Sequence, residues 1–207
     1  MAEFTFDDMT SEYLDVLKEI GNIGAGNATT SLAQVLQKKV DMKVPHVDLM
    51  EFKEVGRWLG GEDTIMAGVY LLVEGDITGS MMFLSKRETA KFMVNQLMMG
   101  MGHPDQEDFD EMELSALSEL GNIMTGSYLN ALSDLTHLKI YPSTPEIKID
   151  MAGAILSAPA IEFATLGDKI LMIQTNFSDD IEIDGYFILV PDMESYAKIM
   201  GALGITL

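Results

Sequence analysis

The chain has 207 residues, of which 33 are acidic and 13 are basic, so its formal net charge is −20. A negative field of this size repels nucleic acids and anionic membrane surfaces, and it favours a partner with exposed lysines or arginines. The chain has no cysteine, which excludes disulfide bonds and thiolate chemistry. Its hydrophobic share of 47% is enough for the core of one domain, or of two intertwined halves of about 100 residues.

The first residues are not those of a targeting signal. Residues 1–13 are acidic and lack the basic flank and the apolar run of a signal peptide. No apolar stretch in the chain approaches the roughly 18 residues that are needed to span a bilayer. We therefore expect a cytoplasmic protein without membrane insertion.

Hydrophobic periodicity and turn residues predict the same order of elements in both halves of the chain. Thr10 or Ser11 can cap a helix of about 25 residues, and Asp110 with Glu113 forms a capping-box-like start for a second one. A polar, turn-forming linker is expected at 101–109. The remaining predicted segments are, in chain order, extended at 43–52, strands at 65–73 and 77–84, a helix at 86–99, extended at 138–150, strands at 169–177 and 181–190, and a helix at 192–203.

The two long helices are copies of each other. Residues 15–27 (DVLKEIGNIGAGN) match residues 115–127 (SALSELGNIMTGS) at an offset of 100, without insertion or deletion. Farther along the chain the offset grows to 106, in the matches of Gly79 with Gly185 and of Glu88 with Glu194.

This duplication predicts a mixed α/β (α+β) fold with pseudo-twofold symmetry. We expect a single domain over 1–207, with internal repeats at about 11–100 and 111–204. Each repeat is a helix-strand-strand-strand-helix unit. The strands of both units are expected in one shared sheet, with the two long helices side by side.

A narrow face of the first helix carries an acid and an amide. At about 100° per residue, Glu19, Asn22 and Gly26 all fall within about 40° of Asp15. The second helix repeats this face with Ser115, Glu119, Asn122 and Gly126. The apolar residues lie elsewhere on each helix, namely Val16, Leu17, Ile20 and Ile23 on the first, and Leu117, Leu120 and Ile123 on the second.

The glycines of these helices need an explanation, because each costs roughly 1 kcal/mol relative to alanine inside a helix. Gly21 and Gly121 fall toward the apolar side, where a missing side chain lets two backbones approach closely. Gly26 and Gly126 continue the polar face, where they leave room for an incoming surface. We therefore expect a large partner to dock on this face.

Other interpretations are weaker. A single Glu-x-x-Asn on a helix is usually solvated, but a second copy in register favours function. The glycines of 21–27 suggest a phosphate loop, yet no strand precedes them and the Lys-Ser/Thr ending is missing. Residues 180–185 suggest a calcium loop, but their alternation is that of a strand.

The three histidines lack ligand spacing, so no metal site is predicted. Met98, Met99 and Met101 are expected to close a helix against the core, and Trp58 to pack.

The residues of the two helix faces match the pattern (Asp/Ser)-x3-Glu-x2-Asn-x22-Pro. The first copy consists of Asp15, Glu19, Asn22 and Pro45, and the second of Ser115, Glu119, Asn122 and Pro145. The chain resembles the CheC family of chemotaxis phosphatases, within the larger CheC/CheX/FliY group, over essentially its whole length. Two motifs in one chain favour the CheC type.

This resemblance implies the hydrolysis of an aspartyl phosphate on the response regulator CheY. Asn22 and Asn122 are then the residues that orient the attacking water. Glu19 and Glu119 pair with the substrate's active-site lysine, and Asp15 and Ser115 hold the docking edge. Pro45 and Pro145 are structural. The protein needs no cofactor of its own, because the substrate protein supplies Mg²⁺.

The resemblance also implies a second partner, the receptor deamidase CheD. We place its contact on the apolar segment at 150–167, which is rich in small residues. The alternative function is that of an adaptor, which sequesters or regulates the deamidase without significant catalysis. The sequence does not rank the two sites.

Overall fold

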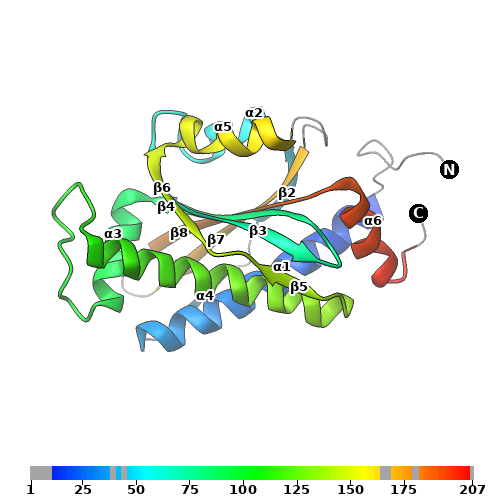
Figure 1. The fold of residues 1–207 in the computed structure, drawn as a ribbon, viewed down its shortest axis with the longest axis horizontal. Helices are drawn as coiled ribbons and strands as arrows, with labels where there is room; N and C mark the ends of the chain where they lie inside the picture. Colours follow the sequence, from blue (N-terminus) through cyan, green and yellow to red (C-terminus); the bar gives the residue numbers. More distant parts are fainter. Residues whose placement is uncertain (1–10, 38–40, 43–45, 164–168, 179–181, 206–207) are drawn as a thin grey trace.

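The computed structural model describes residues 11–37, 41–42, 46–163, 169–178 and 182–205 (Figure 1). The first half contains α1 (Ser11–Leu36), β1 (Asp41–Met42), β2 (His46–Glu51), α2 (Phe52–Trp58), β3 (Ile65–Gly75), β4 (Gly79–Lys86) and α3 (Arg87–Leu97). The second contains α4 (Glu111–Thr136), β5 (Ile140–Pro142), β6 (Glu146–Met151), α5 (Ala152–Phe163), β7 (Lys169–Ser178), β8 (Glu182–Pro191) and α6 (Met193–Ala202).

Two short helices, α2 and α5, were absent from the predicted order. Both follow a strand directly, without the loop that would announce a new element. The N-cap of α2, Glu51, makes no side-chain capping bond, and α2 has only seven residues. The sequence of α5 contains Pro159, which argues against a helix interior. Neither helix therefore leaves the usual start signal in the sequence.

The eight strands of the described residues form one antiparallel sheet in the order β1-β7-β8-β4-β3-β5, with β2 also pairing β7 and β6 pairing β3. The outer strands of each half thus pair with the central hairpin of the other half. The repeats are interlocked through the sheet, and the predicted shared sheet is confirmed.

The pseudo-twofold axis passes through the middle of this sheet. Phe83 and Phe187 face each other in the central β4–β8 ladder, with ring centroids 5.1 Å apart. Phe83 pairs with Val69 in one hairpin and Phe187 with Ile173 in the other, so the hairpins correspond at an offset of 104.

This register corrects one predicted match and confirms another. At an offset of 104 the two glycines Gly79 and Gly185 are not equivalent, so that match was wrong. The two residues that raise the offset, Pro191 and Asp192, come after the matched positions of β4 and β8. They bring α3 and α6 to an offset of 106, from Arg87 to Met193, which confirms the match of Glu88 with Glu194.

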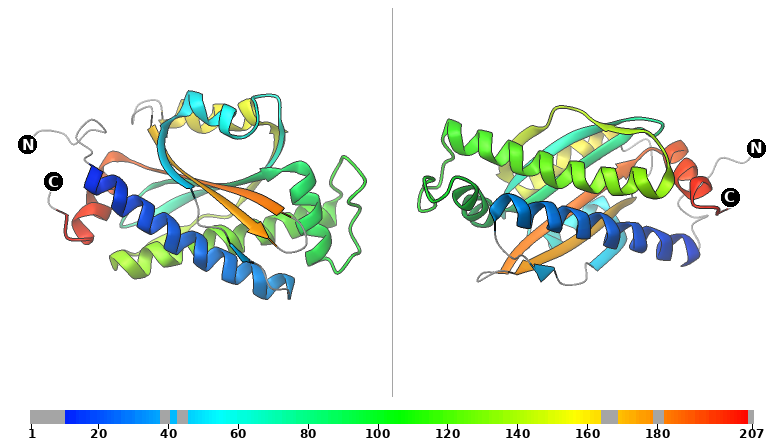
Figure 2. Two further views of the ribbon diagram at one scale, coloured as in Figure 1. Left: turned by 180° about the vertical axis from the view of Figure 1, so that it is seen from behind. Right: turned by 90° about the horizontal axis from the view of Figure 1, so that it is seen from below.

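The sheet is covered on both faces (Figures 1 and 2). The long helices α1 and α4 lie side by side on one face, and α2 and α5 lie on the other. The largest core cluster fills the space between the sheet and the long helices, and a second cluster fills the space beneath α2 and α5. Within the described ranges, no helix has the length and apolar character needed to cross a membrane.

Candidate active sites on the paired helices

The motif residues are held by two helices of equal length. Both α1 and α4 have 26 residues, and they begin 100 positions apart. Each is followed by a residue in the left-handed backbone region, Gln37 (φ 52°) and His137 (φ 58°). At the start of α4 the predicted capping box is confirmed, since Asp110 Oδ1 accepts the Glu113 N–H and Glu113 Oε2 accepts the Asp110 N–H.

Close glycine contacts fix which side of each helix faces the sheet. A Cβ atom on Gly21 would lie 2.8 Å from Cγ2 of Val47, and one on Gly121 would overlap the side chain of Val69. Both glycines therefore allow the close approach that was predicted. By contrast, a Cβ on Gly26 or Gly126 would meet nothing within 4 Å.

The two helices contact each other on a third side. The Tyr128 ring fills the space beside Gly24, and the Ser127 hydroxyl donates to the Ser31 hydroxyl at 2.7 Å. Gly24 lies about 180° around α1 from Asp15, at 100° per residue. Each motif face therefore points away from the partner helix, and the two candidate sites lie on opposite flanks of the helix pair.

Most of the predicted site side chains are exposed on these flanks. They are Asp15, Glu19, Ser115, Glu119 and Asn122. Asn22 differs, because it is half-buried and its Oδ1 is buried without a hydrogen-bond partner in the described part of the chain. No side chain of these six forms a hydrogen bond or ion pair among the described residues. Within the described part of the chain, these side chains are therefore not held by hydrogen bonds or ion pairs to the rest of the fold.

The motif prolines lie farther along the chain. Pro145 is half-buried in the connection between β5 and β6, two strands that pack beside α4. Pro45 lies outside the described residues. The proline of the second motif thus lies between two strands that contact the motif-bearing helix.

Several other sequence predictions can be compared with the structure. The glycines of 21–27 lie within α1, which rules out a phosphate loop there, and Glu182–Gly185 belong to β8, as the strand interpretation required. Residues 180–181 lie outside the described ranges. Of the three methionines expected to close a helix, only Met98 packs on the core, while Met99 and Met101 are 81% and 68% exposed. That prediction was wrong for these two because the chain turns away after α3.

Trp58 was expected to pack and does so only in part. Its side chain is 37% exposed, and its ring stacks on that of His46 with centroids 5.0 Å apart. This pair lies on β2 and α2, away from the long helices. It contributes nothing to either motif face.

Comparison with known proteins places the duplicated motif in a family. The sequence model of the CheC-like family matches residues 12–48 and 112–149, one match in each repeat. The chain is 41% identical to a Bacillus subtilis protein named CheY-P phosphatase CheC, over 98% of this chain and 99% of that protein. It is 35% identical to the CheY-P phosphatase CheX of Thermotoga maritima, over 44% of this chain and 61% of that protein. The chain belongs to the CheC-like family.

Solved structures share the fold at lower sequence identity. The Thermotoga maritima FliY structure superimposes with a TM-score of 0.75 and 23% identity, covering 95% of this chain and 98% of that one. A Borrelia burgdorferi structure, described as a CheX-CheY-BeF3-Mg complex, gives a TM-score of 0.54 and 18% identity, covering 84% of this chain and 96% of that one. These likenesses concern the fold.

Proposed function

We propose that this protein is a phosphatase that hydrolyses the aspartyl phosphate of the response regulator CheY. The motif face carries the proposal: an acid and an amide, without a partner among the described residues, stand beside an open glycine position on each helix. The 41% identity to a protein named CheY-P phosphatase CheC, over 98% of this chain, supports the same substrate.

The amides Asn22 and Asn122 act by placing water. Hydrolysis of an acyl phosphate needs in-line attack by a water molecule, and positioning that water accounts for much of the available acceleration. A carboxamide accepts one hydrogen bond and donates another, and it does not titrate. It can therefore hold a water molecule in line with the phosphorus atom without acting as a base.

The neighbouring carboxylates determine where the amide enters the active site of the regulator. Glu19 and Glu119 lie about one helical turn before the amides and are exposed, so each can pair with a lysine in the regulator's active site. Asp15 and Ser115 stand a further turn away and contact the rim of the bound regulator. The bare positions Gly26 and Gly126 leave space for that regulator at the other end of the face.

The metal ion belongs to the substrate. The phosphorylated regulator brings Mg²⁺ with its acyl phosphate, as the description of the Borrelia complex with CheY, BeF3 and Mg indicates for that relative. The ion neutralises charge on the phosphoryl oxygens, while this chain supplies the amide and the carboxylate. We place this reaction in the cytoplasm.

A second partner is proposed in the receptor deamidase CheD. Its contact is placed on residues 150–167, where the described part forms the end of β6 and the helix α5. This region covers the sheet face opposite the long helices, so the deamidase and the regulator do not compete for the same surface. In the alternative function, deamidase binding is the main role and turnover is incidental.

Phosphate release from phosphorylated CheY tests the proposal and separates it from the adaptor alternative. The wild-type protein is expected to accelerate release, and the double variant Asn22→Ala/Asn122→Ala to leave only the regulator's own rate. Binding of the deamidase is expected to survive in the double variant. Asn27→Ala is the matched control, because Asn27 is an exposed asparagine of α1 about 120° from Asp15 and thus off the motif face. Persistent acceleration by the double variant would show that the amides have been misassigned.

A further inference from the structure

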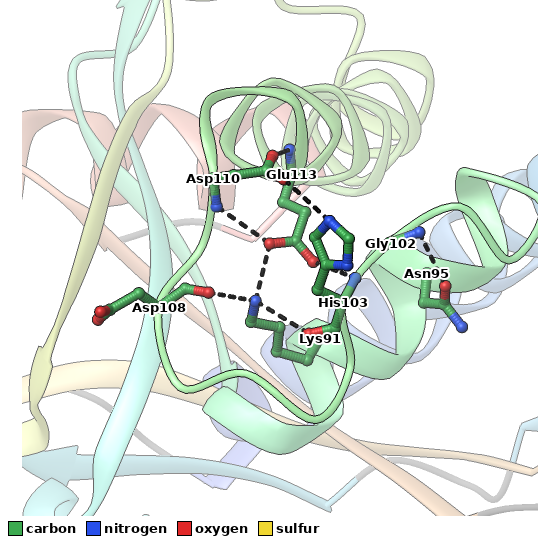
Figure 3. Close-up of polar contacts among 7 residues, drawn as sticks. All are labelled: Lys91, Asn95, Gly102, His103, Asp108, Asp110 and Glu113. Atoms are coloured by element: carbon green, nitrogen blue, oxygen red, sulfur yellow. Dashed lines mark hydrogen bonds and ion pairs between the residues drawn. The ribbon is translucent and has the colours of Figure 1, made fainter.

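The connection between α3 and α4 is held by a buried polar network (Figure 3). Lys91 Nζ lies 2.7 Å from Glu113 Oε2, and these side chains are 2% and 0% exposed. The ammonium also donates to the backbone carbonyls of Asp108 and His103, while the His103 N–H donates to Glu113 Oε1 at 2.8 Å. Both ends of the connection are therefore fastened to the first turn of α4.

This ion pair joins α3 of the first half to α4 of the second, and the sequence has no counterpart to it at the equivalent positions of α6 and α1. At the offset of 106 that relates α3 to α6, Lys91 corresponds to Ala197, and at the offset of 100 Glu113 corresponds to Tyr13. Buried ion pairs add little to stability beyond well-packed apolar residues, but they can fix one conformation over others. We therefore interpret the network as one that fixes the position of the connection, and not as one that adds to the stability of the core.

This fixed connection presents apolar side chains to solvent. Met99 and Met101 are 81% and 68% exposed, and Met112, in the first turn of α4, is 68% exposed. Met99 also has a left-handed backbone (φ 55°), which is uncommon for a residue other than glycine. Single exposed apolar residues are ordinary, but a group of them on an ordered surface is typical of an interaction site.

Met112 continues the motif face of α4, and Met101 lies next to the start of that helix. Met112 precedes Ser115 by three residues, which places it about 60° from that residue and on the same side as Glu119. Met101 precedes Gly102, where a Cβ would lie 3.3 Å from Glu113 Oε1, so it adjoins the start of the helix. At the position of Met112, the first repeat has Glu12.

We propose that Met101 and Met112 form an apolar docking edge that binds the response regulator when it occupies the α4 site. Lys91 and Glu113 are positioning residues that hold this edge in place. This inference rests on the proposed function, since it takes the regulator as the occupant. The edge belongs to the α4 site alone, and it fits a regulator with an apolar patch beside its phosphorylated aspartate.

The experiment isolates each site before the edge is changed. Asn22→Ala leaves the α4 site active, and Asn122→Ala leaves the α1 site active. Adding Met101→Ser and Met112→Ser to the first background is expected to raise KM for phosphorylated CheY by about tenfold with little change in kcat, as for the loss of apolar anchors at an interface. The same pair in the second background is expected to leave KM as it was. Met99→Ser, at an 81% exposed methionine of the same connection that is not part of the edge, is the matched control.

Glu113→Gln tests the positioning role in the same two backgrounds. It keeps the shape of the side chain and removes the charge that binds Lys91. A rise in KM confined to the Asn22→Ala background supports positioning, because a general loss of folding would weaken both sites alike. An equal rise in both backgrounds overturns the positioning role.

The affinity for the regulator tests the docking edge without a measurement of turnover. Titration with beryllofluoride-treated CheY is expected to show weaker binding for the methionine variants only where the α4 site is intact. If no variant accelerates phosphate release but this pattern holds, the proposed function fails and the edge stands. Unchanged binding overturns the edge. A self-association that the methionine variants abolish in sedimentation velocity also overturns it, because the occupant is then a second copy of the chain.

Discussion

The α1 and α4 sites share their helix length, their motif spacing and their open glycine, yet they differ in how the amide is presented. Asn122 is exposed on its flank, whereas Asn22 is half-buried and its oxygen has no hydrogen-bond partner among the described residues. Duplication has therefore preserved the chemical groups while the surroundings have diverged. A buried oxygen must become accessible before it can hold water. We therefore expect the α4 site to be the more active of the two.

The largest expected effect follows from this difference. Asn122→Ala is expected to lower kcat/KM for phosphorylated CheY by roughly fivefold or more, and Asn22→Ala by less than about twofold, because removing the more active site removes most of the transition-state stabilisation. Phosphate release under limiting substrate gives both values. Equal losses would remove the distinction between the sites, and a larger loss for Asn22→Ala would reverse it.

Glycine packing offers a second comparison, measured by urea unfolding. Gly121→Ala is expected to lower the free energy of unfolding by about 2 kcal/mol, because its Cβ would overlap Val69 and the gain in helix propensity offsets only part of the strain. Gly21→Ala, with a 2.8 Å contact to one Val47 methyl, is expected to cost less. Gly126→Ala, in open space, is expected to raise stability by up to about 1 kcal/mol. A costly Gly126→Ala would mean that this position is not open.

The smallest effect concerns acid stability, where only the second half has a buried carboxylate in an ion pair among the described residues. Burial alone would raise the pKa of Glu113, but Lys91 and the backbone N–H groups of His103 and Asp110 outweigh it and hold the pKa below its ordinary 4.5. A lowered pKa contributes stability above pH 4.5 that is lost as the pH falls through the folded-state value.

Unfolding at pH 7 and at steps from about pH 5 to pH 3 measures this contribution. Glu113→Gln is expected to be less stable than the wild type at pH 7, and the difference is expected to shrink on acidification. The exposed Glu111→Gln is the control. A difference that grows as the pH falls would mean that the folded-state pKa of Glu113 is raised instead of lowered.

The sequence predicted the features that repeat in register. The length of the long helices, the capping box at Asp110, the shared sheet and the open and packed glycines all follow from period, spacing and duplication. The helices α2 and α5 could not be predicted, because they begin directly after strands and carry no capping signal. The strand offset was wrong because Pro191 and Asp192 change the offset only after the matched part of β8, and the sequence does not mark that point.

For the candidate sites, the sequence indicated which residues share a face but not how each is exposed. The burial of Asn22 depends on its surroundings rather than on the motif, which is identical in both copies at the acid and the amide. The methionine edge was also missed. Apolar residues after a helix favour packing, and only the network around Lys91 shows that this connection holds them outward.

The central claim is that a neutral amide, acting as both acceptor and donor, steers water onto the regulator's phosphoryl group. Replacing both amides by carboxylates, Asn22→Asp/Asn122→Asp, tests it most directly, because the shape is kept while the donor is lost. Phosphate release from phosphorylated CheY is expected to stay at the regulator's own rate across about pH 5 to 9. Acceleration that returns as the new carboxylates ionise would instead show general-base catalysis and contradict the account.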